Sequence, residues 1–149
     1  NDWSKTLNTI NVNFTGAVSI LNIIANDMEQ NKNGFIVGVS SVAGDRGRKA
    51  NYIYGSAKAG FSAYLSGLRN RLYESGVKVL TVKPGFVNTK MTAKLDLPTK
   101  LTAQPEDVAK DIFTAQQKGK DILYTKPIWR VIMMIIKIIP EWKFKGMSI

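Results

Sequence analysis

Tyr54 and Lys58 lie four residues apart, and Ser41 precedes them in the chain. Residues at this spacing occupy one face of a helix, so a helix here would bring the lysine ammonium close to the phenol. A nearby cation favours the phenolate and lowers the pKa of a tyrosine, which is ordinarily about 10. Tyr54 could then exchange protons near neutral pH, as carbonyl reduction or alcohol oxidation requires. An ordinary surface pair has the same spacing, so this interpretation depends on other segments.

Two short apolar segments are predicted to be strands that end near this helix. Residues 34–41 deliver Ser40 and Ser41 at the end of the first strand, and Pro84 follows the second strand, residues 77–82. Ligands of open α/β sheets bind beyond the carboxyl ends of the strands. We therefore expect Ser41 and the loop 84–89 to face one crevice beside the Tyr54 helix. Taken singly, each feature could be a plain cap or turn.

The motifs around these residues occur in an order typical of one family. They are Asn13-Phe-Thr-Gly16, Ser40-Ser-Val-Ala-Gly44, Tyr54-Gly-Ser-Ala-Lys58 and Pro84-Gly-Phe-Val-Asn-Thr89. In type, order and spacing they resemble the short-chain dehydrogenase/reductase family. The resemblance implies an α/β fold, a Rossmann-type parallel sheet with helices on both faces. It also implies an oxidoreductase that transfers hydride between a nicotinamide and a carbonyl or alcohol, with NADP(H) or NAD(H) as cofactor and NADP(H) slightly favoured.

The same resemblance assigns a role to each motif residue. Tyr54 would donate the proton to the carbonyl oxygen, and Ser41 would orient that oxygen. Lys58 would bind the nicotinamide ribose and lower the pKa of Tyr54, while Asn13 would hold a water that links Lys58 to solvent. Pro84, Gly85, Val87 and Thr89 would form a shelf for the nicotinamide, with the backbone of Val87 pairing with its carboxamide.

The N-terminal region has no glycine-rich turn between a strand and a helix, the element that cradles the phosphates of a dinucleotide. In the family that the chain resembles, an N-terminal half carries that turn and further strands. We therefore expect residues 1–149 to be a single domain, the C-terminal catalytic part of a longer enzyme. The alternative is a catalytically inactive fragment that acts as an assembly or membrane-associating module.

The composition excludes several other classes of protein. The chain has no cysteine and no histidine, so it has no disulfide framework, no Ser-His-Asp triad and no zinc site built from these residues. Its acidic residues show no paired spacing typical of a glycosidase. The net charge of +10 suits an anionic cofactor, a phosphorylated lipid or a membrane surface, but a solvated basic surface remains the default interpretation. The basic residues are dispersed, so no nucleic-acid partner is expected.

Apolar residues recur at spacings of three and four over residues 4–28 and again over residues 54–75. Two such helices could form a homodimer, as the resemblance implies, or could simply cover the sheet. Val12, Ile20 and Ile23 widen the first stripe. Residues 90–100 lack a clear period and would form a mobile segment over the substrate. A helix from Pro105 and a strand at 122–124 should follow, giving a sheet of about three parallel strands with one exposed edge.

The C-terminal segment 128–149 combines apolar and basic residues. Its apolar run is shorter than the roughly 20 residues needed to cross a bilayer, and Arg130 and Lys137 interrupt it. It could be an interfacial helix in contact with anionic lipid, or a helix packed over the substrate pocket or a subunit interface. A cytoplasmic protein with peripheral membrane contact would fit the first alternative.

A narrower resemblance concerns the substrate. Residues 54–60, 118–120, 129–134 and 139–140 are similar to those of the reductases that act on decaprenylphosphoryl-2-keto-erythro-pentose. That resemblance implies a keto-sugar on a polyprenyl phosphate as the substrate.

Overall fold

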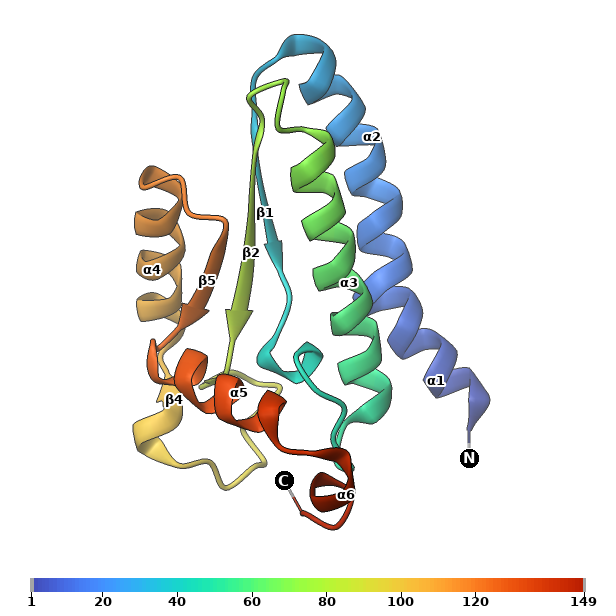
Figure 1. Cartoon of the computed structure of the whole chain (residues 1–149), viewed down its shortest axis with the longest axis vertical. Coiled ribbons are helices and arrows are strands. Elements are labelled where there is room, and N and C mark those ends of the chain that lie inside the picture. Colours follow the sequence, from blue (N-terminus) through green and yellow to red (C-terminus); the bar gives the residue numbers. More distant parts are fainter. Residues whose placement is uncertain (1, 149) are drawn as a thin grey trace.

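A computed structural model describes residues 2–148. Its centre is a parallel sheet of β1 (Phe35–Val39), β2 (Lys78–Pro84) and β5 (Ile122–Thr125) in the order β1-β2-β5 (Figure 1). Val39 pairs with Val82, so these two strands end side by side. The strands are short and rich in β-branched residues, which favour a pleated, buried surface. The expected Rossmann-type α/β fold is confirmed.

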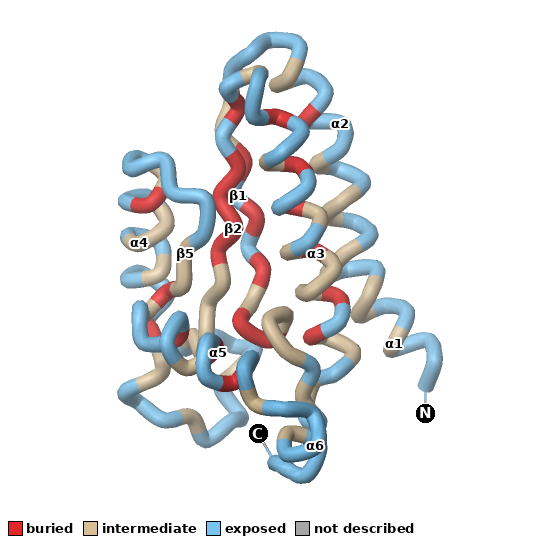
Figure 2. Tube along the Cα trace, viewed as in Figure 1, coloured by how far each residue is buried: buried red, intermediate tan, exposed pale blue. Residues whose placement is uncertain are grey.

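Helices cover both faces of the sheet because side chains alternate along β2. Val79 packs with Ile36 beneath α3 (Tyr52–Arg71) and α2 (Gly16–Asn31), whereas Leu80 and Val82 pack beneath α4 (Pro105–Gln117). In Figure 2 the buried positions are concentrated in β1, β2 and the facing side of α3. The predicted helix start at Pro105 is confirmed, with Glu106 and Asp107 in its first turn.

One long helical rod forms the N-terminal region and lies beside α3. It consists of α1 (Trp3–Ile10), a π-helical turn η1 (Asn11–Thr15) and α2. By length and composition alone this rod could cross a membrane. One of its faces, however, packs through the partly buried Phe14, Leu21 and Met28 onto the core beneath α3. Its other face exposes Val12, Ile20 and Ile23, and dimerisation through that face stays a prediction.

β1 is one of the two edge strands of the three-stranded sheet, and β5 is the other. Val37 and Val39 lie on the same face as their partners Leu80 and Val82, but they are exposed because α4 does not extend over β1. The predicted exposed edge is therefore present among the described residues.

A second, two-stranded parallel sheet was missed by the sequence analysis. It pairs β3 (Phe86–Val87) with β4 (Thr102–Ala103), and η3 (Thr99–Leu101) precedes β4. Each strand has only two residues, too few to show a period of two. This small sheet closes the segment 88–101 into a loop at the carboxyl end of β2.

The C-terminal segment folds into α5 (Ile128–Ile138) and α6 (Glu141–Phe144). Figure 1 shows α5 crossing the carboxyl ends of β2 and β5. It buries Trp129, Met133 and Ile136 against side chains that include Val42 and Phe86. One face of α5 thus covers the loops that follow β1 and β2, and the opposite face is exposed.

Candidate active site

Ser41, Tyr54 and Lys58 come together where β1 meets the start of α3. Ser41 directly follows β1 and caps η2 (Val42–Gly44), its hydroxyl oxygen accepting a hydrogen bond of 3.1 Å from the Ala43 amide. Tyr54 and Lys58 lie in the first two turns of α3. Burial raises the pKa of Tyr54, and the nearby Ser41 hydroxyl partly offsets this shift through hydrogen bonding. The phenol and the serine hydroxyl are therefore neighbours, as the spacing predicted.

Two glycines allow η2 to approach α3 closely enough for this arrangement. A β-carbon on Gly44 would lie 2.7 Å from the backbone nitrogen of Ala59, and one on Gly55 would lie 2.8 Å from the carbonyl oxygen of Ala43. Both distances are too short for a real β-carbon, so any side chain would push the loop away from the helix. The glycines of the Ser-x-x-Gly and Tyr-Gly motifs thus set the distance between Ser41 and Tyr54.

Lys58 lies differently from the sequence expectation. Its ammonium donates a hydrogen bond of 3.1 Å to the carbonyl of Val39, and its Nζ lies 5.7 Å from the centre of the Tyr54 ring. Burial lowers the pKa of Lys58 and raises the pKa of Tyr54. The expected lowering of the Tyr54 pKa by Lys58 is therefore wrong for this arrangement, because loss of water around the phenol outweighs other influences.

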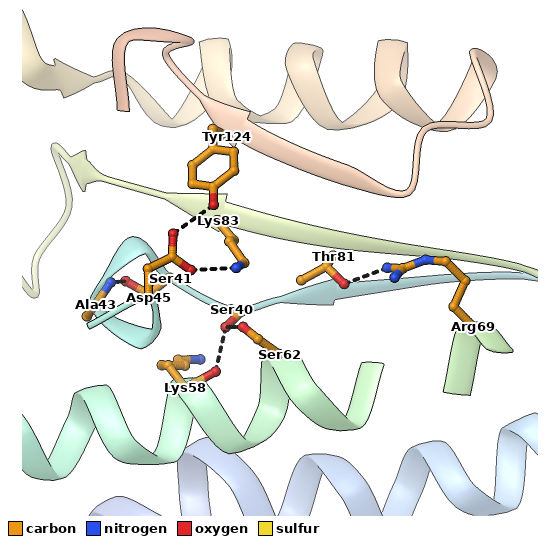
Figure 3. Close-up of polar contacts among 10 residues, drawn as sticks. All are labelled: Ser40, Ser41, Ala43, Asp45, Lys58, Ser62, Arg69, Thr81, Lys83 and Tyr124. Atoms are coloured by element: carbon orange, nitrogen blue, oxygen red, sulfur yellow. Dashed lines mark hydrogen bonds and ion pairs between the residues drawn. The ribbon is translucent and has the colours of Figure 1, made fainter. Parts of the chain in front are cut away.

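Ser40 connects the end of β1 to α3 through hydrogen bonds (Figure 3). Its hydroxyl donates to the Lys58 carbonyl at 2.9 Å and lies 2.7 Å from the Ser62 hydroxyl. The backbone amide of Ser40 donates a hydrogen bond of 2.8 Å to the Val82 carbonyl, so Ser40 is also connected to β2. Ser40 is buried, so it positions the helix turn that carries Lys58 rather than meeting a substrate.

Asn13 lies in η1, the π-helical turn that interrupts the N-terminal rod. Its side-chain amide donates to the Thr9 carbonyl at 3.0 Å, and the neighbouring Phe14 ring packs against Gly60 of α3. Single π-helical turns inside α-helices are frequent at functional sites. Asn13 is thus held near α3, and its predicted role in holding a water stays a prediction.

The loop from Pro84 to Thr89 begins at the carboxyl end of β2, beside that of β1. The Val87 carbonyl accepts a hydrogen bond of 2.6 Å from the Thr92 hydroxyl, whose oxygen also accepts from the Thr89 amide at 3.1 Å. Gly85 lies against the indole of Trp129. The loop thus lies beside the end of β1, and the Val87 carbonyl already has a partner within the chain. Its role as a shelf for the nicotinamide stays a prediction.

An ionic network that the sequence analysis missed lies next to this site. Lys83 pairs with Asp45 at 2.5 Å, and the Tyr124 hydroxyl donates to the other Asp45 oxygen at 2.7 Å (Figure 3). Burial, together with the Asp45 carboxylate, raises the pKa of Tyr124. The network joins η2, β2 and β5. No sequence signal could have revealed it, because its three residues share no motif.

Two hollows lie around this end of the sheet. A small one of about 260 Å³ borders Tyr54 and is lined by Thr9, Asn51 and Tyr52 among others. The Oδ1 atom of Asn51 is buried without a partner. The larger cavity, about 590 Å³, lies between β5 and α5, away from Tyr54. We take the smaller hollow as the candidate site because Tyr54 lines it. Its volume is slightly below the roughly 300–1,000 Å³ of typical ligand sites.

The described residues fit the nicotinamide end of a dinucleotide. Lys58 offers a half-buried ammonium, Asn51 a buried oxygen without a partner, and the loop 84–89 a backbone wall at the strand ends. Within residues 2–148 there is no glycine-rich strand-to-helix turn for the pyrophosphate. A parallel sheet that gathers Ser, Tyr and Lys at its carboxyl edge defines a Rossmann-type α/β protein with a proton-transfer site.

Comparisons with known proteins identify the family. Residues 1–99 match the sequence model described as short chain dehydrogenase. An uncharacterized oxidoreductase of Mycobacterium tuberculosis is 34% identical over 146 residues, which cover 98% of this chain and 58% of that protein. One of Streptomyces coelicolor is 33% identical over 151 residues, covering 99% and 59%. The chain belongs to the short-chain dehydrogenase family, and it spans slightly more than half the length of these curated relatives.

Solved structures support the fold. A short chain dehydrogenase from Burkholderia cenocepacia, in complex with NADP, superposes with a TM-score of 0.81 at 20% identity, over 90% of this chain and 56% of that one. One from Sphingobium yanoikuyae, in complex with NADPH, gives a TM-score of 0.72 at 20% identity, over 89% and 56%.

Proposed function

We propose that this chain carries the catalytic residues of an NAD(P)(H)-dependent oxidoreductase acting on a carbonyl or alcohol. The observation that carries the proposal is the meeting of Tyr54, Ser41 and Lys58 at the carboxyl edge of the parallel sheet. Membership of the short-chain dehydrogenase family supports it, as do structural neighbours that hold NADP or NADPH.

When bound, a reduced nicotinamide supplies hydride for the carbonyl carbon. Tyr54 then gives its hydroxyl proton to the carbonyl oxygen, and the Ser41 hydroxyl holds that oxygen by a hydrogen bond. The Lys58 ammonium compensates the negative charge that develops at the phenol. Because burial raises the pKa of Tyr54, its phenol is protonated at neutral pH and serves as an acid.

For the substrate, we propose a carbonyl borne on an amphipathic molecule, such as a keto-sugar on a polyprenyl phosphate. The support is the narrower sequence resemblance and the position of α5, an apolar helix that covers the loops after β1 and β2. Reduction of small soluble ketones alone, with no turnover of any lipid-linked one, would contradict this substrate.

The test compares Tyr54→Phe with Tyr73→Phe. Tyr73 lies just after α3, is 79% exposed and does not line the hollow beside Tyr54. Oxidation of NADPH is followed with a panel of ketones. Loss of the acid should reduce turnover by about a hundredfold to ten-thousandfold in Tyr54→Phe. Tyr73→Phe should behave as the unchanged protein.

Binding and folding are measured in parallel. Fluorescence titration with NADPH and NADH, and urea unfolding, should give nearly equal values for Tyr54→Phe and the unchanged chain. Retained turnover in Tyr54→Phe would remove Tyr54 from the mechanism. A folded chain that binds neither nucleotide and reduces no ketone would favour a non-catalytic module instead.

A further inference from the structure

The exposed side of α5 and α6 forms a basic-apolar surface. We use this name for the following exposed residues: Ile128, Val131, Met134, Ile135, Ile138 and Trp142, with Arg130, Lys137, Lys143 and Lys145. Ile138 is 74% and Trp142 is 75% exposed. Leaving such large apolar side chains in contact with water costs free energy. Clustered apolar exposure of this kind marks an interaction site.

The helical spacing separates this surface from the core. At 100° per residue, Trp129, Met133 and Ile136 project to one side of α5, where they are buried. Val131 and Ile138 project to nearly the opposite side. These two residues are exposed because α5 packs onto the core through its opposite face. A partner could therefore contact them without any movement of the helix.

The cations stand at one border of the apolar stripe. Arg130 and Lys137 are seven residues apart, so they lie one above the other along α5. Both also line the cavity of about 590 Å³ between α5 and β5, together with Met134, Ile138 and Lys120. A groove with apolar walls and three cations fits a molecule that is apolar at one end and anionic at the other.

The C-terminal segment is strongly basic. From residue 126 to residue 148 there are five basic residues and one acidic residue, Glu141. Glu141 is paired with Arg46 at 2.7 Å, so its carboxylate does not neutralise the neighbouring lysines. Lys143, inside α6, and Lys145, directly after it, are exposed and extend the positive charge beyond α5.

We propose that the basic-apolar surface binds the interface of an anionic lipid bilayer, with α5 lying in the membrane plane. Its apolar side chains would enter the headgroup boundary while Arg130, Lys137, Lys143 and Lys145 contact lipid phosphates. A second copy of the chain is a poorer occupant, because a two-fold interface places each patch against itself and would bring like charges together. The inference is independent of the proposed chemistry.

The structure also ties this surface to the candidate site. Arg46, in the loop that carries Ser41, donates to the carbonyls of Ile136, Lys137 and Ile139 at 3.1, 3.1 and 2.6 Å. Its guanidinium also lies 4.0 Å from the centre of the Phe144 ring. A membrane bound at α5 and α6 would therefore lie next to the loop that follows Ser41.

The test is flotation of the full chain with vesicles, which separates binding from aggregation because aggregates do not float. Neutral phosphatidylcholine vesicles are compared with vesicles that contain phosphatidylglycerol, at low and high salt. We expect binding to the anionic vesicles that weakens with salt. Ile138→Glu should weaken it by about tenfold or more, since it removes an apolar side chain that would enter the bilayer on binding. Arg130→Gln with Lys137→Gln should weaken it by about thirtyfold, at about 1 kcal/mol for each cation.

Matched controls use the same substitutions elsewhere. Ile23→Glu, at a residue 73% exposed on α2, and Lys110→Gln with Lys118→Gln, on and just after α4, should leave binding unchanged. Circular dichroism verifies that each variant is folded. Loss of binding in Ile23→Glu but not in Ile138→Glu would assign the membrane surface to α2 and overturn the inference.

Three further outcomes would also overturn it. One is equal binding to neutral and anionic vesicles, and another is no binding to either. The third is a dimer, detected by sedimentation velocity without lipid, that Ile138→Glu dissociates.

Discussion

Gly44→Ala tests how the site is assembled. The added β-carbon would lie 2.7 Å from the Ala59 nitrogen and from the Lys58 carbonyl carbon, and 2.9 Å from the Lys58 carbonyl oxygen. Ordinary contact begins near 3.4 Å, and all three neighbours are backbone atoms that cannot rotate away. The backbone of Gly44 is not left-handed, so the effect is steric. Separating η2 from α3 should cost about 1–3 kcal/mol of the unfolding free energy.

The matched control is Gly67→Ala. Gly67 lies inside α3 on its exposed side, and a β-carbon there meets nothing within 4 Å. The substitution should raise the unfolding free energy by about 0.5–1 kcal/mol, because alanine is the better helix former. Urea unfolding should therefore move the two midpoints in opposite directions. With a slope of about 2 kcal/mol per molar urea, Gly44→Ala should lower the midpoint by about 0.5–1.5 M.

Activity gives an independent reading of the same variant. Gly44→Ala should lower turnover even without urea, where the variant is still fully folded. The reason is that the loop moves away from Tyr54 and misplaces the Ser41 hydroxyl, which orients the carbonyl oxygen. The reasoning is refuted if Gly44→Ala unfolds at the same urea concentration as the unchanged chain. It is also refuted if both glycine variants shift in the same direction by similar amounts.

Three further predictions concern the side chains beside the site. Arg46→Ala should lower the unfolding free energy by about 1.5–3 kcal/mol, since the carbonyls at the end of α5 lose a charged donor, and limited proteolysis should then cut the C-terminal segment faster. Asp45→Asn should cost about 3–5 kcal/mol, because it leaves the Lys83 ammonium buried without its partner, and urea unfolding would show a cost near zero if that pair were unimportant. Burial and the Asp45 carboxylate raise the pKa of Tyr124, so the stability that its neutral phenol contributes is complete below about pH 10 and is lost as the pH rises further. Tyr124→Phe should therefore show a smaller fall in unfolding free energy above pH 10. An equal fall in the variant and the unchanged chain would contradict the assignment.

Local patterns in the sequence predicted much of this fold. The runs at 34–41 and 77–82 indicated strands, and both strands exist and pair in parallel. Pro105 followed by two acidic residues marked a helix start, and α4 begins there. These predictions succeeded because strand and helix signals depend on residues that are neighbours in the chain. The paired strands β3 and β4 gave no such signal, because two residues are too few to define a period.

The sequence predicted that Ser41, Tyr54 and Lys58 would lie near one another, whereas the roles of Asn13 and of the loop 84–89 stay predictions. Ser41, Tyr54 and Lys58 were recognised by type and spacing, and the fold brings them together. The predicted direction of the Tyr54 pKa shift was wrong, because residue spacing does not show that the phenol loses water on folding. Spacing also does not show where the Lys58 ammonium points. That ammonium is directed to Val39, a residue of another element.

The sequence alone therefore determined which residues can do chemistry and which elements carry them. Only the tertiary structure decided how those residues are tuned and what surrounds them. The burial of Tyr54, the pairing of Asp45 with Lys83, and the division of α5 into a buried and an exposed face all arise from segments far apart in the chain. Desolvation and ion pairing depend on distances in space, and those distances exist only once the sheet and its helices have packed.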